Sequence, residues 1–286
     1  HVVPETSAAM CRYVELEHVR TGWDEVTRQW YVGPARYFFS YSWDSPWEDV
    51  VSALVAHTHT FAVEEARKAR EEREYERQPL PYYWIDIFAV NQHLAVPPWK
   101  CTSGLGDDCP GCAAVVADMH DWNDDDPMKP KGFARVIEST KHTLVLNEPW
   151  DNPRPPTRVW CLFEGYQTLS RDGELEVVLG PQQQLDLAKS LDKKFGELEA
   201  LVSGIDARLA EATVENDHTK IFGAIEKLPR GFDGLSDQMR LSQRCWLAAA
   251  AQRGLARTDP LRGPMSEVEL AAEAVEIGAG RNCECT

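Results

Sequence analysis

The stretch that decides the fold is residues 142–169, HTLVLNEPWDNPRPPTRVWCLFEGYQTL. Residues 142–146 form a short apolar run, which predicts a buried strand. The proline-rich segment 149–156 that follows predicts a rigid loop. A helix is expected from about Val159 through Leu169. Because a strand, a loop and a helix in this order are part of a βαβ unit, the stretch predicts a parallel α/β sheet.

Strands and helices also alternate on both sides of this stretch. Three further strands are expected, at 36–43, 82–88 and 175–179. One helix is expected to begin at the N-cap residue Ser45 and another at Gly132. The strands are nearly continuous apolar runs, as in a sheet whose two faces are both covered by helices. The sequence therefore predicts an α/β fold with a flavodoxin-like parallel sheet of four to five strands and flanking helices.

The character of the chain changes outside this α/β region. Residues 94–131 are rich in Pro, Gly, Asp and Cys and read as a long insertion, whereas leucines at helical spacing follow residue 181. The predicted organisation is an N-terminal helical segment at 1–35, the α/β domain at 36–181, a C-terminal helical extension at 182–252 and a tail at 253–286.

The charge and the cysteines exclude some classes of protein. A formal net charge of −16 argues against a nucleic-acid partner, because such binding depends on Lys and Arg that neutralise phosphates. No apolar run reaches the roughly 20 residues that cross a bilayer, so no membrane partner is expected. The eight cysteines are scattered along a chain that is large enough to fold without disulfides, which indicates reduced thiols and a cytoplasmic location.

The segment Arg158-Val159-Trp160-Cys161-Leu162-Phe163-Glu164 carries the strongest chemical signal. Ligands of an open parallel sheet bind beyond the carboxyl ends of the strands, where this helix begins. Trp160 and Glu164 are four residues apart and share a helix face, so a ring and a carboxylate could bind a sugar together. The alternative is structural: Trp160 and Cys161 belong to the core, and Glu164 only favours the positive end of the helix.

Four segments in this order resemble a Toll/interleukin-1 receptor (TIR) domain of the divergent type found in algal and protist proteins. They are YFFSYS, YYWIDIF with FAVNQH after it, HTLVLNEPW and RVWCLFEGY. The last one is similar to the Trp-Cys-x-x-Glu block that opens the helix after the third TIR strand. The resemblance covers about residues 35–181. It departs from the family at Gly165, where TIR domains have Leu, in the length of the segment after the second strand, and in the lack of an apparent fifth strand.

The resemblance implies an enzyme. In enzymatic TIR domains the helix glutamate is the catalytic residue of NAD⁺ cleavage, and the matching residue here is Glu164. NAD⁺ would be the substrate, and no cofactor is required. The implied substrate-binding residues are Ser40, Tyr41, Trp43, Asp86, Arg158, Trp160 and Cys161. Arg36 and Arg154 join Arg158 as candidates for the pyrophosphate, although each could be a surface arginine, and Asp86 could equally be a structural cap.

A second group of candidate ligands lies in the insertion. Cys101, Cys109, Cys112 and His120 could form a tetrahedral structural zinc site. A single Cys-x-x-Cys does not specify zinc, and thiols without a metal are the alternative.

Three functions stay open at this point. The first is a TIR-type NAD⁺ glycohydrolase or cyclase, an NAD⁺ nucleosidase acting in signalling, innate immunity or another form of defence. The second is a non-catalytic module that self-associates as a scaffold. The third is a sensor of NAD-derived nucleotides that binds without turnover.

Overall fold

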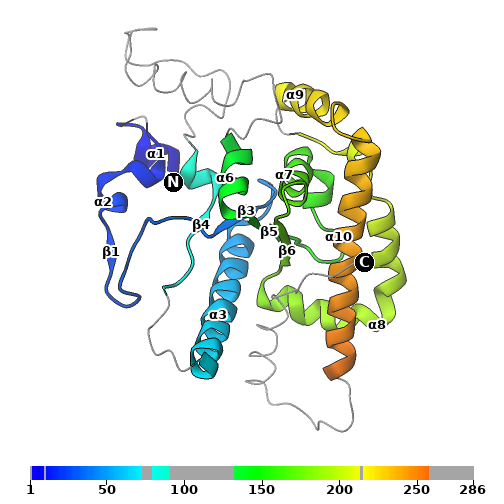
Figure 1. Ribbon diagram of the computed structural model, residues 1–286, viewed down its shortest axis with the longest axis horizontal. Coiled ribbons are helices and arrows are strands. Elements are labelled where there is room, and N and C mark those ends of the chain that lie inside the picture. Colours follow the sequence, from blue (N-terminus) through cyan, green and yellow to red (C-terminus); the bar gives the residue numbers. More distant parts are fainter. Residues whose placement is uncertain (1, 10, 73–78, 91–131, 213–214, 258–286) are drawn as a thin grey trace. The chain divides into compact units, whose positions relative to one another are not determined.

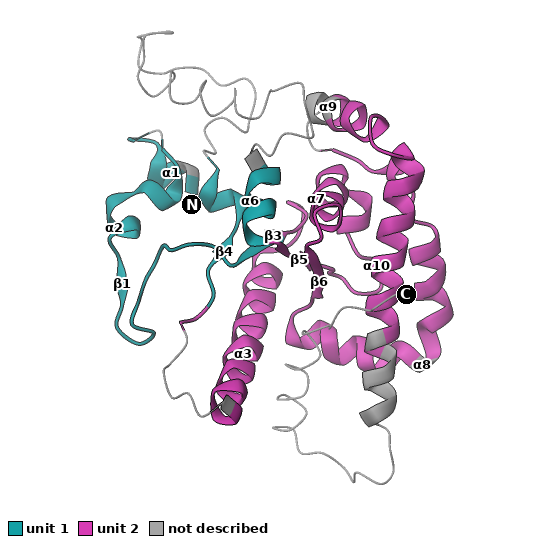
Figure 2. Ribbon diagram, in the orientation of Figure 1, with its two compact units in different colours: residues 1–39, 81–140 teal, residues 40–80, 141–286 magenta. Residues whose placement is uncertain are grey.

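The computed structural model describes residues 2–9, 11–72, 79–90, 132–212 and 215–257 (Figure 1). The chain divides into two compact units (Figure 2). Unit 1 comprises His1–Phe39 and Pro81–Thr140, and unit 2 comprises Ser40–Leu80 and Lys141–Thr286. The zinc candidates Cys101, Cys109, Cys112 and His120 lie outside the described residues.

The parallel strands confirm the predicted α/β class. They are β3 (Tyr37–Ser40), β4 (Tyr83–Trp84), β5 (His142–Leu146) and β6 (Glu174–Val178), and they form one four-stranded sheet in the order β4-β3-β5-β6. Numbered along the chain this order is 2-1-3-4, which is consistent with a flavodoxin-like sheet. Among the described residues after β6 there are helices and no further strand.

The first 35 residues are less helical than the sequence indicates. They contain α1 (Val2–Thr6), η1 (Tyr13–Glu15) and α2 (Glu17–Arg20), and then an antiparallel pair, β1 (Trp23–Asp24) with β2 (Gln29–Trp30). Local turn chemistry explains the pair. The Asp24 carboxylate accepts hydrogen bonds from the backbone N–H groups of Val26 and Thr27, and Arg28 has a φ of 58°, so the chain reverses here instead of continuing a helix.

The strand expected at 82–88 is wrong in its second half. Only Tyr83–Trp84 pairs with β3, and α4 (Asp86–Ala89) follows. Asp86 opens this helix and accepts a hydrogen bond from the Ile87 N–H at 2.6 Å. A carboxylate in the first turn stabilises a helix, and this local interaction overrides the apolar pattern of the segment.

Aromatic side chains compensate for the short pairing of β4. Tyr83 stacks on Tyr37 and Trp84 stacks on Phe38, with ring centroids 5.7 Å and 4.9 Å apart. Phe133, from α6 (Gly132–Thr140), meets the Trp84 ring edge-on at 5.1 Å. Such aromatic pairs each contribute about 1 kcal/mol beyond the area they bury.

Helices cover both faces of β5 and β6 within unit 2. Thr143 shares a 2.7 Å hydrogen bond with Thr168 of α7 (Val159–Leu169), while His142 and Glu176 face His57 of α3 (Trp47–Glu72). Side chains alternate along a strand, so neighbouring positions point to opposite faces. Four of the five residues of β5 are buried, which explains why the run is continuously apolar.

Beyond β6 the chain forms helices that pack against α7. These are α8 (Pro181–Ser203), η4 (Ala207–Leu209), α9 (Glu215–Glu226) and α10 (Gly231–Arg257). Leu162 of α7 belongs to one buried cluster with Ile225 of α9 and Leu235 of α10. Burying one such side chain fully contributes about 2 kcal/mol, so this cluster holds α7 firmly against α9 and α10. No helix of the described residues is long and apolar enough to cross a membrane.

Candidate active site

Glu164 lies in the second turn of α7 and its side chain is directed at the end of β3. Its Oε2 accepts a hydrogen bond from the Ser40 hydroxyl at 2.6 Å, and Ser40 is the last residue of β3. Both residues are buried, with 7% and 1% of their surface exposed. The strand order reverses between β3 and β5, and the carboxyl ends of strands at such a reversal are where ligands of open α/β sheets bind.

The local sequence explains how α7 presents this carboxylate. The short helix η3 (Pro155–Thr157) ends at Arg158, an extended residue that serves as the N-cap of α7. The backbone N–H of Val159 then bonds to the carbonyl of Glu211, which fixes where α7 begins. From this start Val159 and Leu162 enter the core, while Glu164 lies next to β3.

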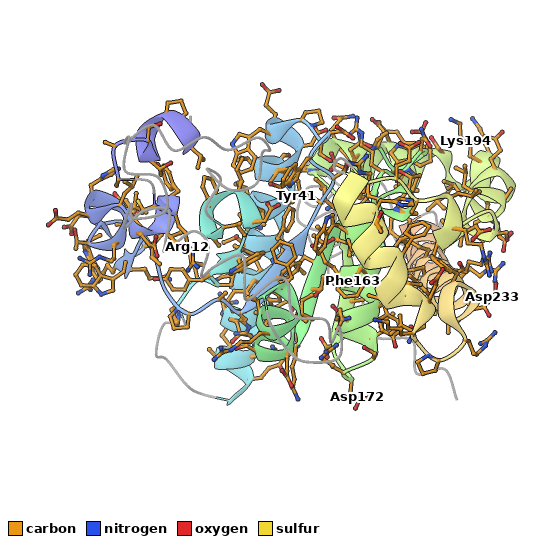
Figure 3. The ribbon with its side chains drawn as sticks, turned by 90° about the horizontal axis from the view of Figure 1, so that it is seen from above. Arg12, Tyr41, Phe163, Asp172, Lys194 and Asp233 are labelled. Carbon is orange, nitrogen blue, oxygen red and sulfur yellow. The ribbon has the colours of Figure 1, made fainter. Side chains whose placement is uncertain are left out.

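The residues that follow β3 form the more open side of the site. Tyr41, which is labelled in Figure 3, is half-buried, and Trp43 is 49% exposed. Arg158 is half-buried, and its guanidinium lies 3.5 Å from the carboxylate of Asp44. Arg158 and Trp43 are side chains of the kind that a nucleotide could use, the arginine for phosphate and the aromatic residue for a ring.

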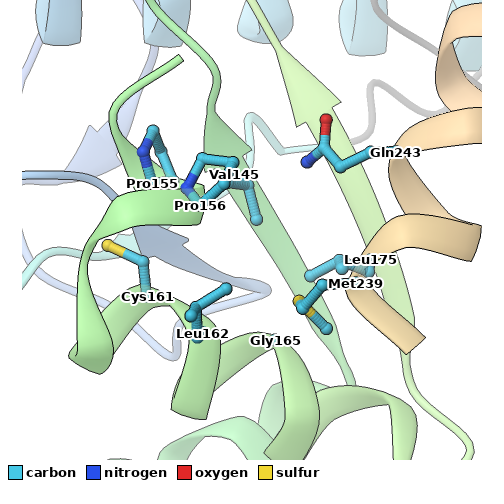
Figure 4. A pocket seen from close by; sticks show the side chains of 9 residues that line it. All are labelled: Val145, Pro155, Pro156, Cys161, Leu162, Gly165, Leu175, Met239 and Gln243. Carbon is cyan, nitrogen blue, oxygen red and sulfur yellow. The ribbon is translucent and has the colours of Figure 1, made fainter. Parts of the chain in front are cut away.

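A small cavity lies beside the same helix (Figure 4). Its volume is about 20 Å³, and its wall contains Cys161 and Gly165 of α7 together with Met239 and Gln243 of α10. The cavity has room for about one water molecule, so it cannot hold a nucleotide. Glu164 does not line it. Cys161, expected as a substrate-binding residue, therefore faces this internal space, and Trp160 is half-buried beside Phe163, with ring centroids 6.3 Å apart.

The remaining predicted site residues are not gathered around Glu164 within unit 2. Asp86 and Arg36 belong to unit 1, where Asp86 opens α4 and the Arg36 guanidinium lies 5.8 Å from the centre of the Tyr37 ring. In the part of the chain that the structure describes, no group of three or more His, Cys, Asp or Glu side chains is placed to hold a metal ion.

Sequence reasoning missed Glu148, a second buried carboxyl group at the carboxyl end of β5. Glu148 is 1% exposed, and its Oε1 accepts a hydrogen bond from the backbone N–H of Gly180, the N-cap of α8. Burial raises the pKa of Glu148 to about 7; the Gly180 N–H lowers it, Asp49 raises it further, and Arg154 lowers it. Its position directly after an apolar strand was the signal that could have identified it, because that edge of a parallel sheet is where ligands bind.

The chain matches no protein-family model, no curated protein and no solved structure. The site is therefore judged by its geometry. It offers one carboxylate fixed by a hydroxyl at the carboxyl end of β3, with Arg158 at the N-cap of the same helix and with Tyr41 and Trp43 shortly after Ser40 in the sequence. Such an arrangement can hydrogen-bond the hydroxyls of a sugar and stabilise positive charge that develops next to it.

Proposed function

We propose that this chain carries a TIR-like domain with a C-terminal helical extension and that it cleaves the bond between nicotinamide and ribose in NAD⁺. Glu164 is the catalytic residue. The observation that supports this most strongly is the 2.6 Å hydrogen bond from Ser40, because it holds the carboxylate at the edge where the strand order reverses. We place the activity in the cytosol, in signalling or defence.

In the proposed reaction the glycosidic bond breaks through a transition state that resembles an oxocarbenium ion. The negative charge of Glu164 stabilises the positive charge that develops on the ribose ring, and its oxygens accept hydrogen bonds from the ribose hydroxyls. Nicotinamide leaves as a neutral molecule because it is cationic in the substrate, so no general acid is needed. Water then adds to the ribose and releases a proton, or the adenine ring adds and gives a cyclic product.

The interactions of Glu164 favour this role in one further respect. The Ser40 hydroxyl donates a hydrogen bond to Oε2, so the carboxylate keeps a fixed orientation before any substrate arrives. Preorganised electrostatic groups of this kind contribute about 3 kcal/mol each to a transition state, since they need no reorganisation during the reaction. Arg158 would contact the pyrophosphate, and Tyr41 and Trp43 would contact the rings.

A non-catalytic scaffold is the second candidate function, and the burial of Glu164 favours it. A carboxylate that is only 7% exposed and already accepts a hydrogen bond can serve simply to join α7 to β3. In that case the domain would self-associate, and its surface rather than this site would carry the function.

Nicotinamide release from NAD⁺ separates the two. The proposal predicts turnover by the full chain and a loss of at least about a hundredfold in Glu164→Gln, which keeps the shape and removes the charge. Glu197→Gln is the matched control, because Glu197 is an exposed residue of α8 and its replacement changes the net charge equally. Equal turnover in wild type and Glu164→Gln would contradict the catalytic role. No turnover at high protein concentration, where self-association is complete, would favour the scaffold.

A further inference from the structure

Four titratable side chains converge on the face of β5 and β6 that α3 covers. His142 Nε2 lies 3.1 Å from Glu176 Oε2, and His142 Nδ1 lies 3.3 Å from Glu174 Oε2. His57 of α3 approaches the same Glu176 oxygen, with its Nε2 at 3.8 Å. His57 and Glu176 are nearly buried, with side-chain exposures of 7% and 10%. The cluster therefore joins a helix to two neighbouring strands, with its buried part at His57 and Glu176.

The protonation state of the rings decides how strong this junction is. Each nitrogen of His142 faces a carboxylate, and only the charged imidazolium can donate a hydrogen bond from both nitrogens at once. A neutral ring would leave one nitrogen lone pair directed at a carboxylate oxygen. His142 can thus donate to both carboxylates only when its ring is charged.

Glu176 stays charged under the conditions that charge the histidines. Burial acts to raise its pKa, but the interactions with His142 and His57 lower it below the ordinary value. These histidines are its electrostatic partners, and Glu174 also faces His142. On the opposite face of the strands α7 contributes an uncharged partner, Thr168, which bonds to Thr143. The negative charge of Glu176 and the positive charge of the histidines therefore stabilise each other.

We propose that His57, His142, Glu174 and Glu176 form a proton-dependent clasp that fastens α3 to β5 and β6. The clasp is closed while the imidazoles carry their protons and loosens when they lose them, because only the charged rings attract the carboxylates. It acts on a helix that matters for the site, since α3 begins a few residues after Ser40 and carries Asp49, a neighbour of Glu148. This device is independent of the reaction proposed above and can be tested without any substrate.

Hydrogen exchange of the full chain tests the clasp directly. After correction for intrinsic exchange, protection of the α3 amides around His57 should fall about tenfold between pH 5.5 and pH 8. In His57→Gln and in Glu176→Gln the fall should be smaller than about threefold, because the contact between α3 and β6 can no longer gain or lose charge. His59→Gln is the matched control: His59 is an exposed residue of the same helix, and this variant should behave as the wild type does.

If the protection of the α3 amides in the wild type is the same at pH 5.5 and pH 8, the proposal is overturned. It is also overturned by a fall that persists in full in His57→Gln, which would assign the pH dependence to Glu148 instead, or by a fall that disappears in His59→Gln. If the variants do not fold, a histidine NMR titration of the wild-type chain decides. The His57 and His142 signals should titrate together with the α3 amide shifts, and failure of either ring to titrate between about pH 5 and pH 8.5 would also overturn it.

Discussion

Ser40 Oγ lies 2.6 Å from Glu164 Oε2, and this contact joins the carboxyl end of β3 to the second turn of α7. The two residues are 124 positions apart in the chain, and both are buried. Ser40 was expected to contact substrate. The structure shows this hydroxyl bonded to Glu164, so at the proposed site Ser40 would also orient that carboxylate.

Ser40→Ala removes the only proton that this hydroxyl can donate to Glu164. The variant should lose about 1–3 kcal/mol of unfolding free energy, because a buried carboxylate oxygen is left without that donor. Urea denaturation measures the loss. Ser203→Ala is the control, since the Ser203 hydroxyl donates to Glu199 at 2.9 Å on an exposed surface, and it should change stability by less than about 0.5 kcal/mol. If the two substitutions change the free energy of unfolding equally, the Ser40–Glu164 hydrogen bond contributes no more to stability than an exposed one.

Gly165 tests whether α10 restricts α7 next to the site. A Cβ at this position would come within 3.1 Å of Met239 Cε and Sδ. Gly165→Ala should be close to neutral, because the end of a flexible methionine can move and a helix gains about 1 kcal/mol from Ala in place of Gly. Gly165→Leu, the residue found in TIR domains, should cost about 1–3 kcal/mol through overpacking. Thermal unfolding checks both, and Met239→Ala should reduce the cost of the leucine. If Gly165→Leu is as stable as the wild type, the close packing of Gly165 against Met239 is contradicted.

Glu148 should make the stability of the protein fall as the pH rises. Burial raises its pKa to about 7, so the folded state holds this proton more tightly than the unfolded state does. The stabilising effect is complete below the ordinary pKa near 4.5 and disappears as the pH rises through about 7. Between about pH 5 and pH 8 the free energy of unfolding of the wild type should therefore fall by about 2–3 kcal/mol. That of Glu148→Gln should not show this fall. Denaturation at a series of pH values measures the difference. If the free energies of unfolding of the wild type and of Glu148→Gln change in parallel with pH, the raised pKa of Glu148 is refuted.

Substitutions of Arg158 and Asp44 distinguish a role in stability from a role in ligand binding. Their contact at 3.5 Å involves an Asp44 side chain that is 68% exposed, so Asp44→Asn should change stability by less than about 1 kcal/mol. If Arg158 binds pyrophosphate, Arg158→Met should weaken ADP-ribose binding about tenfold, while Asp44→Asn, which removes a competing anion, should not weaken it. Calorimetry with ADP-ribose checks both. Unchanged affinity in Arg158→Met would remove this arginine from the proposed site.

The sequence predicts the sheet better than it predicts the site. Strand β5 and helix α7 begin and end where the apolar run and the proline-rich loop indicate, because burial and loop chemistry act there in the same direction. The strand at 82–88 fails because Asp86 starts a helix, an effect of one side chain that a pattern of apolar residues does not contain.

Within the site, sequence reasoning identifies Glu164 but not its partner's role. The resemblance to TIR domains points to both Ser40 and Glu164, yet only the folded chain shows that one donates a hydrogen bond to the other. Sequence reasoning does not identify Glu148 or the His142–Glu176 pair for the same reason, because their properties arise from burial and from neighbours distant in sequence.

The structure of the chain bound to ADP-ribose tests the central claim most directly. The account predicts that a ribose hydroxyl lies about 3 Å from the Glu164 carboxylate, with the sugar at the carboxyl ends of β3 and β5. A ribose bound elsewhere, with Glu164 still bonded to Ser40 and shielded from the ligand, would contradict it.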